Sequence, residues 1–206
     1  MVTYFIIAIT VGISILAMNN DEIKNRFMFN AYAISHHREW WRFFTHGVLH
    51  ANFPHLIFNM LSLYFFGPAV ERTFRENIFG PGAGEAYYIL LYVGALVASS
   101  IYTYFKQKDN MYYNALGASG AVSAVIYAAV LMFPLSQISL YFIPMPAWVF
   151  GAVYLIGSWY MARRNIGNIG HDAHFWGAVY GFLLPIALKP VLFQLFLVQM
   201  QLYFTR

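Results

Sequence analysis

The chain has 206 residues, of which 60% are hydrophobic and only 10% are charged. This number of charges is too small to cover a water-exposed surface. The composition therefore excludes an ordinary water-soluble domain and indicates a polytopic membrane protein. The net charge of +4 is spread through the loops, which argues against a nucleic-acid partner, and the absence of cysteine excludes disulfides and thiolate metal sites.

The first apolar segment, residues 2–18, is predicted to be a retained membrane span. A cleavable signal peptide is the alternative, but such a peptide has a basic region before its apolar core, and this chain has none there. Residues 19–54 then form a long loop rich in charged and aromatic side chains, a mixture that is typical of the membrane interface.

Five further apolar segments complete a predicted set of six spans within a single domain of residues 1–206. These segments are residues 54–70, 86–105, 115–133, 145–161 and 172–188. A polar turn at residues 165–170 precedes the last span. Residues 191–206 form a short apolar tail that either lies on the interface or extends the sixth helix past a bend. The pattern therefore predicts an all-α polytopic membrane protein.

Spans that are joined by loops alternate in direction, so the second, fourth and sixth helices begin on the same face of the membrane. Polar side chains gather near the start of all three helices. They are His50, His55 and Asn59 for the second helix, Ser119 for the fourth and His174 for the sixth. The alternation therefore predicts that these five residues converge at a similar depth.

Ser119 and His174 are expected to meet as a nucleophile and its base. His174 shares one helix face with two small residues, and two more flank Ser119, a pattern that lets membrane helices approach closely. The four small residues are Gly117, Gly120, Gly177 and Gly181. A serine in a membrane helix more often bonds a backbone carbonyl, whereas an ionisable histidine at membrane depth is costly and marks a function. An imidazole within hydrogen-bond reach would activate the hydroxyl.

The same residues resemble the motifs of the rhomboid intramembrane serine proteases. The resemblance runs from about residue 40 to 185, and its motifs follow the family's order. They are the pair Trp41-Arg42, His50-x4-His55-x3-Asn59, Gly117-Ala118-Ser119-Gly120 and His174-x-x-Gly177-x-x-x-Gly181. It implies a six-transmembrane-helix rhomboid-like bundle with a long interfacial loop between helices 1 and 2.

This resemblance implies a serine endopeptidase that cleaves transmembrane segments of other membrane proteins. Ser119 would be the nucleophile, and His174 the general base and then the general acid. The oxyanion hole would be formed by His50, Asn59 and the backbone N–H of Ser119, with His55 and the four glycines in structural roles near the site. The implied partners are transmembrane substrates and the lipid bilayer, and no cofactor or metal is required.

Two features near the implied dyad call for an explanation. Rhomboids usually carry an aromatic residue four positions after the nucleophile, where its ring stacks on the catalytic histidine, and this chain has Ser123 there. We expect another aromatic to orient the imidazole, with Trp176, Tyr180 or an aromatic of the fifth helix such as Trp148 as candidates. Asp172 lies two residues before His174, so it points to a different helix face and is expected to cap the helix rather than complete a triad.

The resemblance also implies an orientation in the membrane. With cytoplasmic termini, as in the family, the active site opens to the extracytoplasmic side, although only four of the twelve basic residues then lie inside and the positive-inside rule favours the reverse. The short chain, with no soluble domain at either end, suggests a bacterial form in the cell's inner membrane.

Two alternatives remain open. One is a non-catalytic rhomboid-like protein that binds membrane clients, although relatives of that kind typically lack the serine or the histidine. The other is a di-iron membrane oxygenase with histidine boxes, which needs about eight histidines on one cluster, against seven in this chain.

Overall fold

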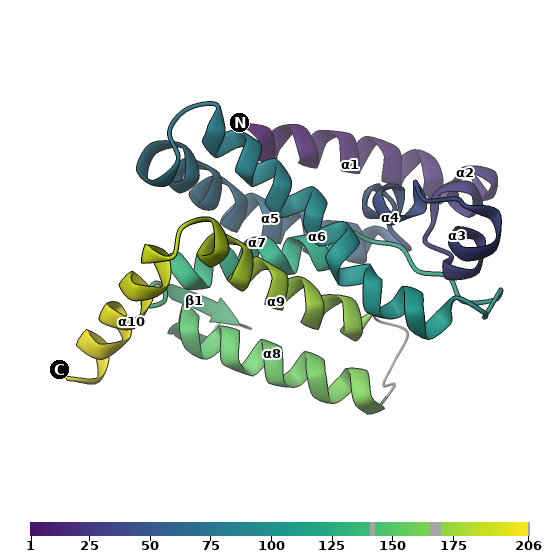
Figure 1. Cartoon of the computed structure of the whole chain (residues 1–206). Coiled ribbons are helices and arrows are strands. Elements are labelled where there is room, and N and C mark those ends of the chain that lie inside the picture. The colour runs from purple at the N-terminus through teal and green to yellow at the C-terminus, as the bar shows by residue number, and fades with distance from the viewer. Residues whose placement is uncertain (141–142, 165–169, 206) are drawn as a thin grey trace.

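The computed structural model describes residues 1–140, 143–164 and 170–205, which form an all-helical bundle with one small β-hairpin (Figure 1). Of the turn predicted at residues 165–170, only Gly170 lies within the described residues. A helix occupies each of the six segments that the sequence marks as apolar. They are α1 (Val2–Met18), α5 (Phe53–Thr73), α6 (Ala83–Gln107), α7 (Ser119–Met132), α8 (Ala147–Arg164) and α9 (His171–Leu188).

The fourth helix begins later than the predicted residue 115. Ala115 instead pairs with Phe29 in an isolated antiparallel bridge, with N···O distances of 2.9 and 3.0 Å. Gly117 then adopts a φ of +127°, a backbone angle that residues other than glycine rarely adopt. These two features keep residues 115–118 out of the helix, so that Ser119 becomes the first residue of α7.

The long loop after α1 is a folded body rather than an open connection. It contains the short helices α2 (Asp21–Phe27), α3 (Ala31–His37), α4 (Arg42–Thr45) and the 3-10 turn η1 (His46–Val48). Arg42 donates to the carbonyl oxygens of Asn25 and Met28 at 2.9 and 2.7 Å and forms an ion pair with Glu39. The loop therefore reaches α5 along a fixed path.

Helix length and composition identify at least two membrane-crossing segments. One is α5 with the π-turn η2 (Phe74–Ile78) that continues it, and the other is α6. Helix α9 and the C-terminal α10 (Val191–Phe204) are apolar enough only as a pair and are bent by 113°, while α1 and α7 are apolar but shorter. The protein is thus an integral membrane protein of helical type.

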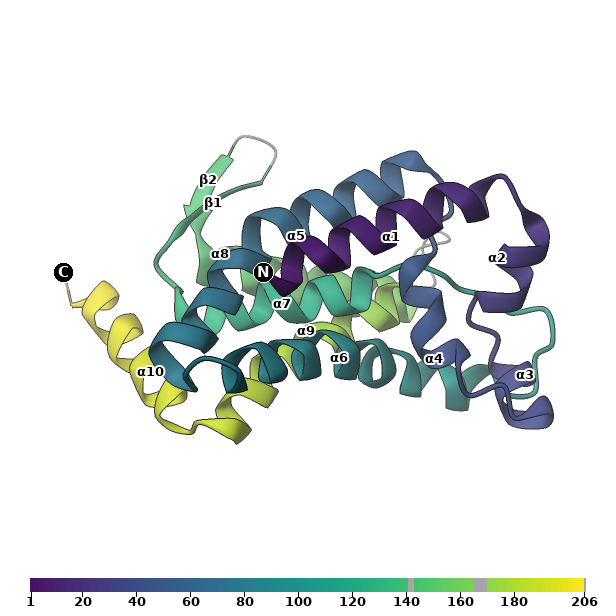
Figure 2. The same cartoon turned by 90° about the horizontal axis from the view of Figure 1, so that it is seen from above.

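A β-hairpin that the sequence analysis did not predict precedes α8. Strand β1 (Gln137–Leu140) pairs antiparallel with β2 (Ile143–Pro146), and Gln137 lies opposite Pro146. The fifth helix, predicted from residue 145, therefore begins at Ala147. Figure 2 shows the hairpin projecting from the bundle near the start of α8.

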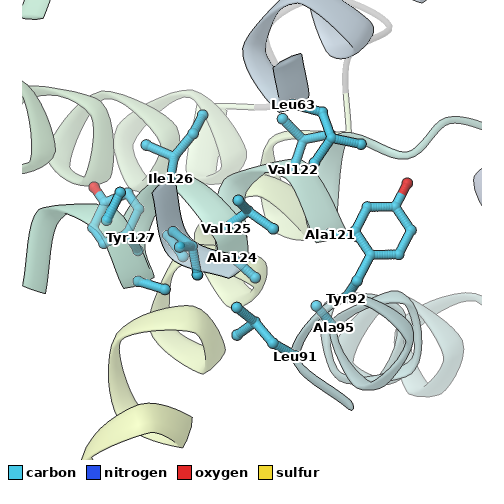
Figure 3. Close-up of a cluster of buried hydrophobic side chains, with 14 of the residues drawn as sticks. Leu63, Leu91, Tyr92, Ala95, Ala121, Val122, Ala124, Val125, Ile126 and Tyr127 are labelled. Carbon is cyan, nitrogen blue, oxygen red and sulfur yellow. The ribbon is translucent and has the colours of Figure 1, made fainter. Parts of the chain in front are cut away.

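Helix α7 forms the core of the bundle. Figure 3 shows its residues Val122 and Val125 beside Leu63 of α5 and Leu91 of α6. Leu63, Leu91 and Val125 are completely buried, and nearly every residue of α7 after its first turn is buried as well. The helix that carries Ser119 is therefore held on several sides.

Helix α1 is fixed to α5 by a buried carboxylate. Glu71 accepts hydrogen bonds from the backbone N–H groups of Val2 and Thr3 at 2.7 and 2.9 Å, and from the Thr3 hydroxyl at 2.7 Å. A negative charge at a helix N-terminus is stabilised by the free N–H groups and the helix dipole. The start of α1 is thereby positioned against the far end of α5.

Candidate active site

Ser119 lies where the positive-φ turn meets α7. The N–H of Gly117 donates to the carbonyl oxygen of His46 at 3.0 Å, which ties this turn to the loop before α5. Ser119 itself is half-buried. The backbone thus presents a serine at a helix N-terminus, next to a fixed turn.

Helix α9 contacts α7 through backbone atoms. A Cβ on Gly177 would overlap the carbonyl group of Gly120, and a Cβ on Gly181 would overlap the backbone of Ala124. At the other end of this contact, a Cβ on Gly120 would lie 3.3 Å from the carbonyl oxygen of Ala173. The register therefore brings the first turn of α7, with Ser119, beside the first turn of α9, which carries His174.

The two side chains do not share a hydrogen bond in the described part of the chain. Catalytic hydrogen bonds are often long in the absence of substrate and tighten only when it binds. The close α7–α9 register is therefore the feature that relates Ser119 to His174, and the expected dyad remains a proposal.

Tyr154 of α8 lies against the imidazole of His174. The two rings are nearly parallel, at 23°, with centroids 6.0 Å apart. The three aromatics named from the sequence have other contacts: Trp176 packs on Tyr102, Tyr180 donates to the carbonyl oxygen of Leu90, and Trp148 packs on Tyr203. The aromatic beside His174 is thus one from the fifth helix, as one of the sequence-based candidates allowed, but it is Tyr154 and not Trp148.

Ser123 joins this tyrosine to the helix that begins at Ser119. Its hydroxyl donates to the carbonyl oxygen of Ser119 at 2.8 Å and is hydrogen-bonded to the hydroxyl of Tyr154 at 2.7 Å. The position that carries an aromatic in the resembled family therefore holds a polar link to an aromatic of another helix.

His55 and Asn59 face the turn before Ser119. A Cβ on Gly117 would lie 2.7 Å from Cε1 and 3.0 Å from Nε2 of His55, so this ring packs directly on the turn. Asn59 donates one amide hydrogen to the carbonyl oxygen of His55 at 3.0 Å, which leaves its second amide hydrogen available. Both residues occupy the first two turns of α5.

His50 lies behind His55 and is 2% exposed. Its Nδ1 is 2.9 Å from the hydroxyl oxygen of Ser14 on α1, and its ring meets that of His55 edge-on at 5.0 Å. Burial, and then the neighbouring His55, lower the pKa of His50 to about 3. This imidazole is therefore neutral and enclosed.

His46 is a second enclosed imidazole of the loop. It is buried, and its Nε2 lies 3.2 Å from the hydroxyl oxygen of Ser100 on α6. Burial lowers its pKa to about 4, although nearby backbone groups that accept hydrogen bonds act in the opposite direction. Since its carbonyl oxygen also holds Gly117, His46 supports the turn before Ser119.

Asp172 does not cap α9, contrary to the prediction. The helix begins at His171, the cap position is Gly170, and no side chain bonds there. The carboxylate instead forms an ion pair with Lys106 of α6 at 3.2 Å. The acid therefore joins α9 to α6.

An apolar cavity of about 340 Å³ lies beside the second half of α7, where Tyr127 and Val130 line it. It is bounded by α7, α8, α9 and α10, and its walls include Tyr127, Trp148, Ala152 and Phe182. Within the described ranges, no group of three or more histidine, aspartate or glutamate side chains is placed to hold a metal ion.

The chain belongs to the rhomboid family. The family model described as "Rhomboid domain" matches residues 37–190, which include the loop before α5, the turn before Ser119 and all of α9. The class that the fold and the site define is thus that of rhomboid membrane proteins.

Individual relatives agree with this assignment. The chain is 33% identical over 148 residues to the rhomboid protein YdcA of Bacillus subtilis, and this alignment covers 71% of the chain and 66% of the relative. It is 31% identical over 150 residues to the rhomboid protease GluP of the same organism, covering 73% and 26%. For the rhomboid protease GlpG of Photorhabdus laumondii the identity is 27% over 152 residues, covering 74% and 49%. The chain thus spans from about a quarter to two thirds of the length of these relatives.

Proposed function

We propose that this protein is an intramembrane serine endopeptidase that cleaves transmembrane segments of other membrane proteins. The observation that carries the proposal is the backbone contact of Gly120 with Ala173 and Gly177, which sets Ser119 beside the turn that holds His174. Relatives named as rhomboid proteases add support. The proposal includes six membrane-spanning helices, α1 and α5 to α9, with the site opening to the extracytoplasmic side.

In the proposed mechanism, Ser119 Oγ attacks the carbonyl carbon of the scissile peptide while His174 takes the hydroxyl proton. The tetrahedral intermediate collapses with cleavage of the C–N bond, and His174 returns the proton to the departing amine. Water then repeats the sequence on the ester, so that the acid product leaves and Ser119 regains its proton. Apart from the substrate and water, these steps need no further reactant.

The negative charge on the carbonyl oxygen needs donors close to Ser119. The sequence-based expectation gave this role to His50, Asn59 and the backbone N–H of Ser119. The packing supports His55 in place of His50, because the His55 ring lies on Gly117 while His50 is enclosed behind it and engaged with Ser14. The proposed oxyanion hole is therefore His55, Asn59 and the Ser119 N–H.

A substrate helix hides its carbonyl groups in internal hydrogen bonds, so it must unwind before Ser119 can reach one. Cleavable segments are therefore expected to carry glycine or proline near the cut, since these residues weaken a helix. The lipid bilayer is the implied solvent, and no cofactor or metal takes part in the proposed steps.

The test is cleavage of a model transmembrane substrate by the purified protein in detergent. Wild type should cut, whereas Ser119→Ala and His174→Ala should not, at unchanged thermal stability. Labelling by a fluorophosphonate, which reacts with activated serines, should follow the same pattern. Binding of the substrate without cleavage by wild type would favour the non-catalytic alternative, and iron in the purified protein would favour the oxygenase.

Two histidine variants separate the proposed oxyanion donor from its neighbour. Removing one such donor costs about 100-fold in kcat in other serine proteases, so His55→Ala and Asn59→Ala should each lower kcat by about that factor. His50→Ala should lower the thermal midpoint, and its loss in kcat should be well below 100-fold. The reverse pattern for the two histidines would return the donor role to His50.

A further inference from the structure

The ring of Tyr154 is confined on more than one side. One neighbour is the imidazole of His174, and on its own helix the ring stacks on Phe150 with centroids 5.9 Å apart at 29°. Tyr127 of α7 lies 6.0 Å away at 52°. A ring enclosed in this way has few alternative rotamers, so it presents a fixed surface to the imidazole.

The hydroxyl of Tyr154 is fixed as well, and its role as a donor follows from counting hydrogens. The carbonyl oxygen of Ser119 can only accept, so Ser123 must use its single hydroxyl hydrogen there. The contact of 2.7 Å between the two hydroxyl oxygens is then donated by Tyr154. The result is a chain of two bonds, from the phenol of Tyr154 through Ser123 to the backbone of Ser119.

We propose that Tyr154 is the positioning residue for His174 and that Ser123 anchors it to the residue that carries the nucleophile. The inference rests on the proposed function, because it assigns the imidazole a partner in Ser119. The ring contact of Tyr154 with His174 and the two hydrogen bonds from Tyr154 to Ser119 together connect the two residues through a third helix, α8.

The placement on α8 has a direct consequence for the site. Ser119 and His174 belong to α7 and α9, which touch through their backbones, whereas Tyr154 belongs to α8. Helix α8 is joined to α7 by the Tyr154–Ser123 bond and by a second bond, from the hydroxyl of Tyr127 to the carbonyl oxygen of Gly151. Both bonds hold α8 on α7, but only the Tyr154–Ser123 bond belongs to the ring that faces His174.

Three variants test the proposal in the cleavage assay. Tyr154→Leu removes the ring, and a misplacement of about 1 Å at the reacting groups costs about 100-fold, so kcat should fall by that order while KM changes little. Tyr154→Phe keeps the ring and loses its hydroxyl bond to Ser123, whereas Ser123→Ala keeps the tyrosine and loses both bonds of the chain. Each should lower kcat by about fivefold to tenfold, far less than Tyr154→Leu. A much smaller loss with phenylalanine than with leucine is the signature of a positioning ring.

Tyr127→Phe is the matched control. It breaks the other hydroxyl bond between α7 and α8 without removing a ring that stacks on His174. It should lower thermal stability to a similar degree as Tyr154→Phe and leave kcat within about twofold of wild type, because the Tyr154 ring stays on His174 and keeps its bond to Ser123. Equal kcat for Tyr154→Leu and wild type, or equal losses for Tyr154→Leu and Tyr127→Phe, would overturn the proposal.

A second readout does not need catalysis. The Hε1 proton of His174, assigned in the NMR spectrum by its loss in His174→Ala, should shift when Tyr154→Leu removes the ring current and stay within a small fraction of that shift in Tyr154→Phe. An unchanged resonance in Tyr154→Leu contradicts the positioning role. The measurement is equally decisive if wild type cuts no substrate, so failure of the proposed function and failure of this inference give different results.

Discussion

Helix α7 meets its neighbours α9 and α8 in two different ways. The α9 side is a backbone contact at Gly120, Gly177 and Gly181, where no Cβ fits. The α8 side is joined by two tyrosine hydroxyl bonds and borders a cavity of about 340 Å³. The first contact fixes where Ser119 and His174 lie, and the second carries the ring that faces the imidazole. The positions of Ser119 and His174 therefore depend on close backbone packing, whereas the contact with the imidazole of His174 depends on two side-chain hydrogen bonds.

The largest expected effect comes from adding one methyl group on the α9 side. In Gly181→Ala the new Cβ overlaps the backbone of Ala124, so the helices must separate. We expect a loss of about 3 kcal/mol in stability and about 100-fold in kcat, measured by thermal denaturation and substrate cleavage.

Gly157→Ala on α8 is the control for that change, because the nearest atom to its Cβ is the methyl of Met161 at 3.9 Å. Alanine is the better helix former by about 1 kcal/mol, so this variant should be neutral or slightly stabilised. Similar losses in the two variants would contradict the contrast between the two sides of α7.

Much of this architecture could be predicted from local patterns in the sequence. Apolar runs mark the helices, and the spacing of Gly177 and Gly181 behind His174 marks the face that meets α7. Which aromatic of the fifth helix faces His174 could not be predicted, because the bond of Tyr154 to Ser123 joins residues 31 positions apart and depends on how α8 is rotated. Spacing did offer a signal for His55, since it lies four residues before Asn59 on one face of α5 while His50 precedes the helix, and the packing of His55 on Gly117 agrees with that signal.

The turn before Ser119 should also respond to acid. Burial lowers the pKa of His46, whose carbonyl oxygen holds the turn before Ser119, from 6.5 to about 4. Below pH 6.5 His46 binds a proton in the unfolded chain but not in the folded chain. The contribution of His46 to the free energy of unfolding is therefore complete above pH 6.5 and is lost as the pH falls toward 4. At about 1.4 kcal/mol per pKa unit, His46 alone accounts for a decrease of up to about 3 kcal/mol.

The measurement is the thermal midpoint in detergent from pH 7.5 to pH 4.5. His46→Gln, which can still bond the hydroxyl of Ser100, should show a shallower decrease than wild type. An identical pH profile for the two proteins would show that His46 is not the group responsible.

The smallest expected effect belongs to the looser side. Ala152 of α8 is exposed and lines the apolar cavity, so Ala152→Leu can place its additional carbon atoms there and should raise stability by less than about 1 kcal/mol, through packing contacts alone. The matched change on the tight side, Ala124→Leu, introduces the same atoms at a completely buried position against α9 and should destabilise strongly. Thermal midpoints of the two variants compare the sides directly, and destabilisation by both would mean that the cavity is not free to accept a side chain.

The hydrogen bonds of α1 have a consequence for biosynthesis. This helix is translated before α5, so the groups that bond its Thr3 and Ser14 hydroxyls, Glu71 and the His50 region, are made later. Until then the Ser14 hydroxyl can bond to a carbonyl in the preceding turn of its own helix. Insertion of α1 into the bilayer and its final docking are thus separate events, and α1 must wait for α5 before its position is set.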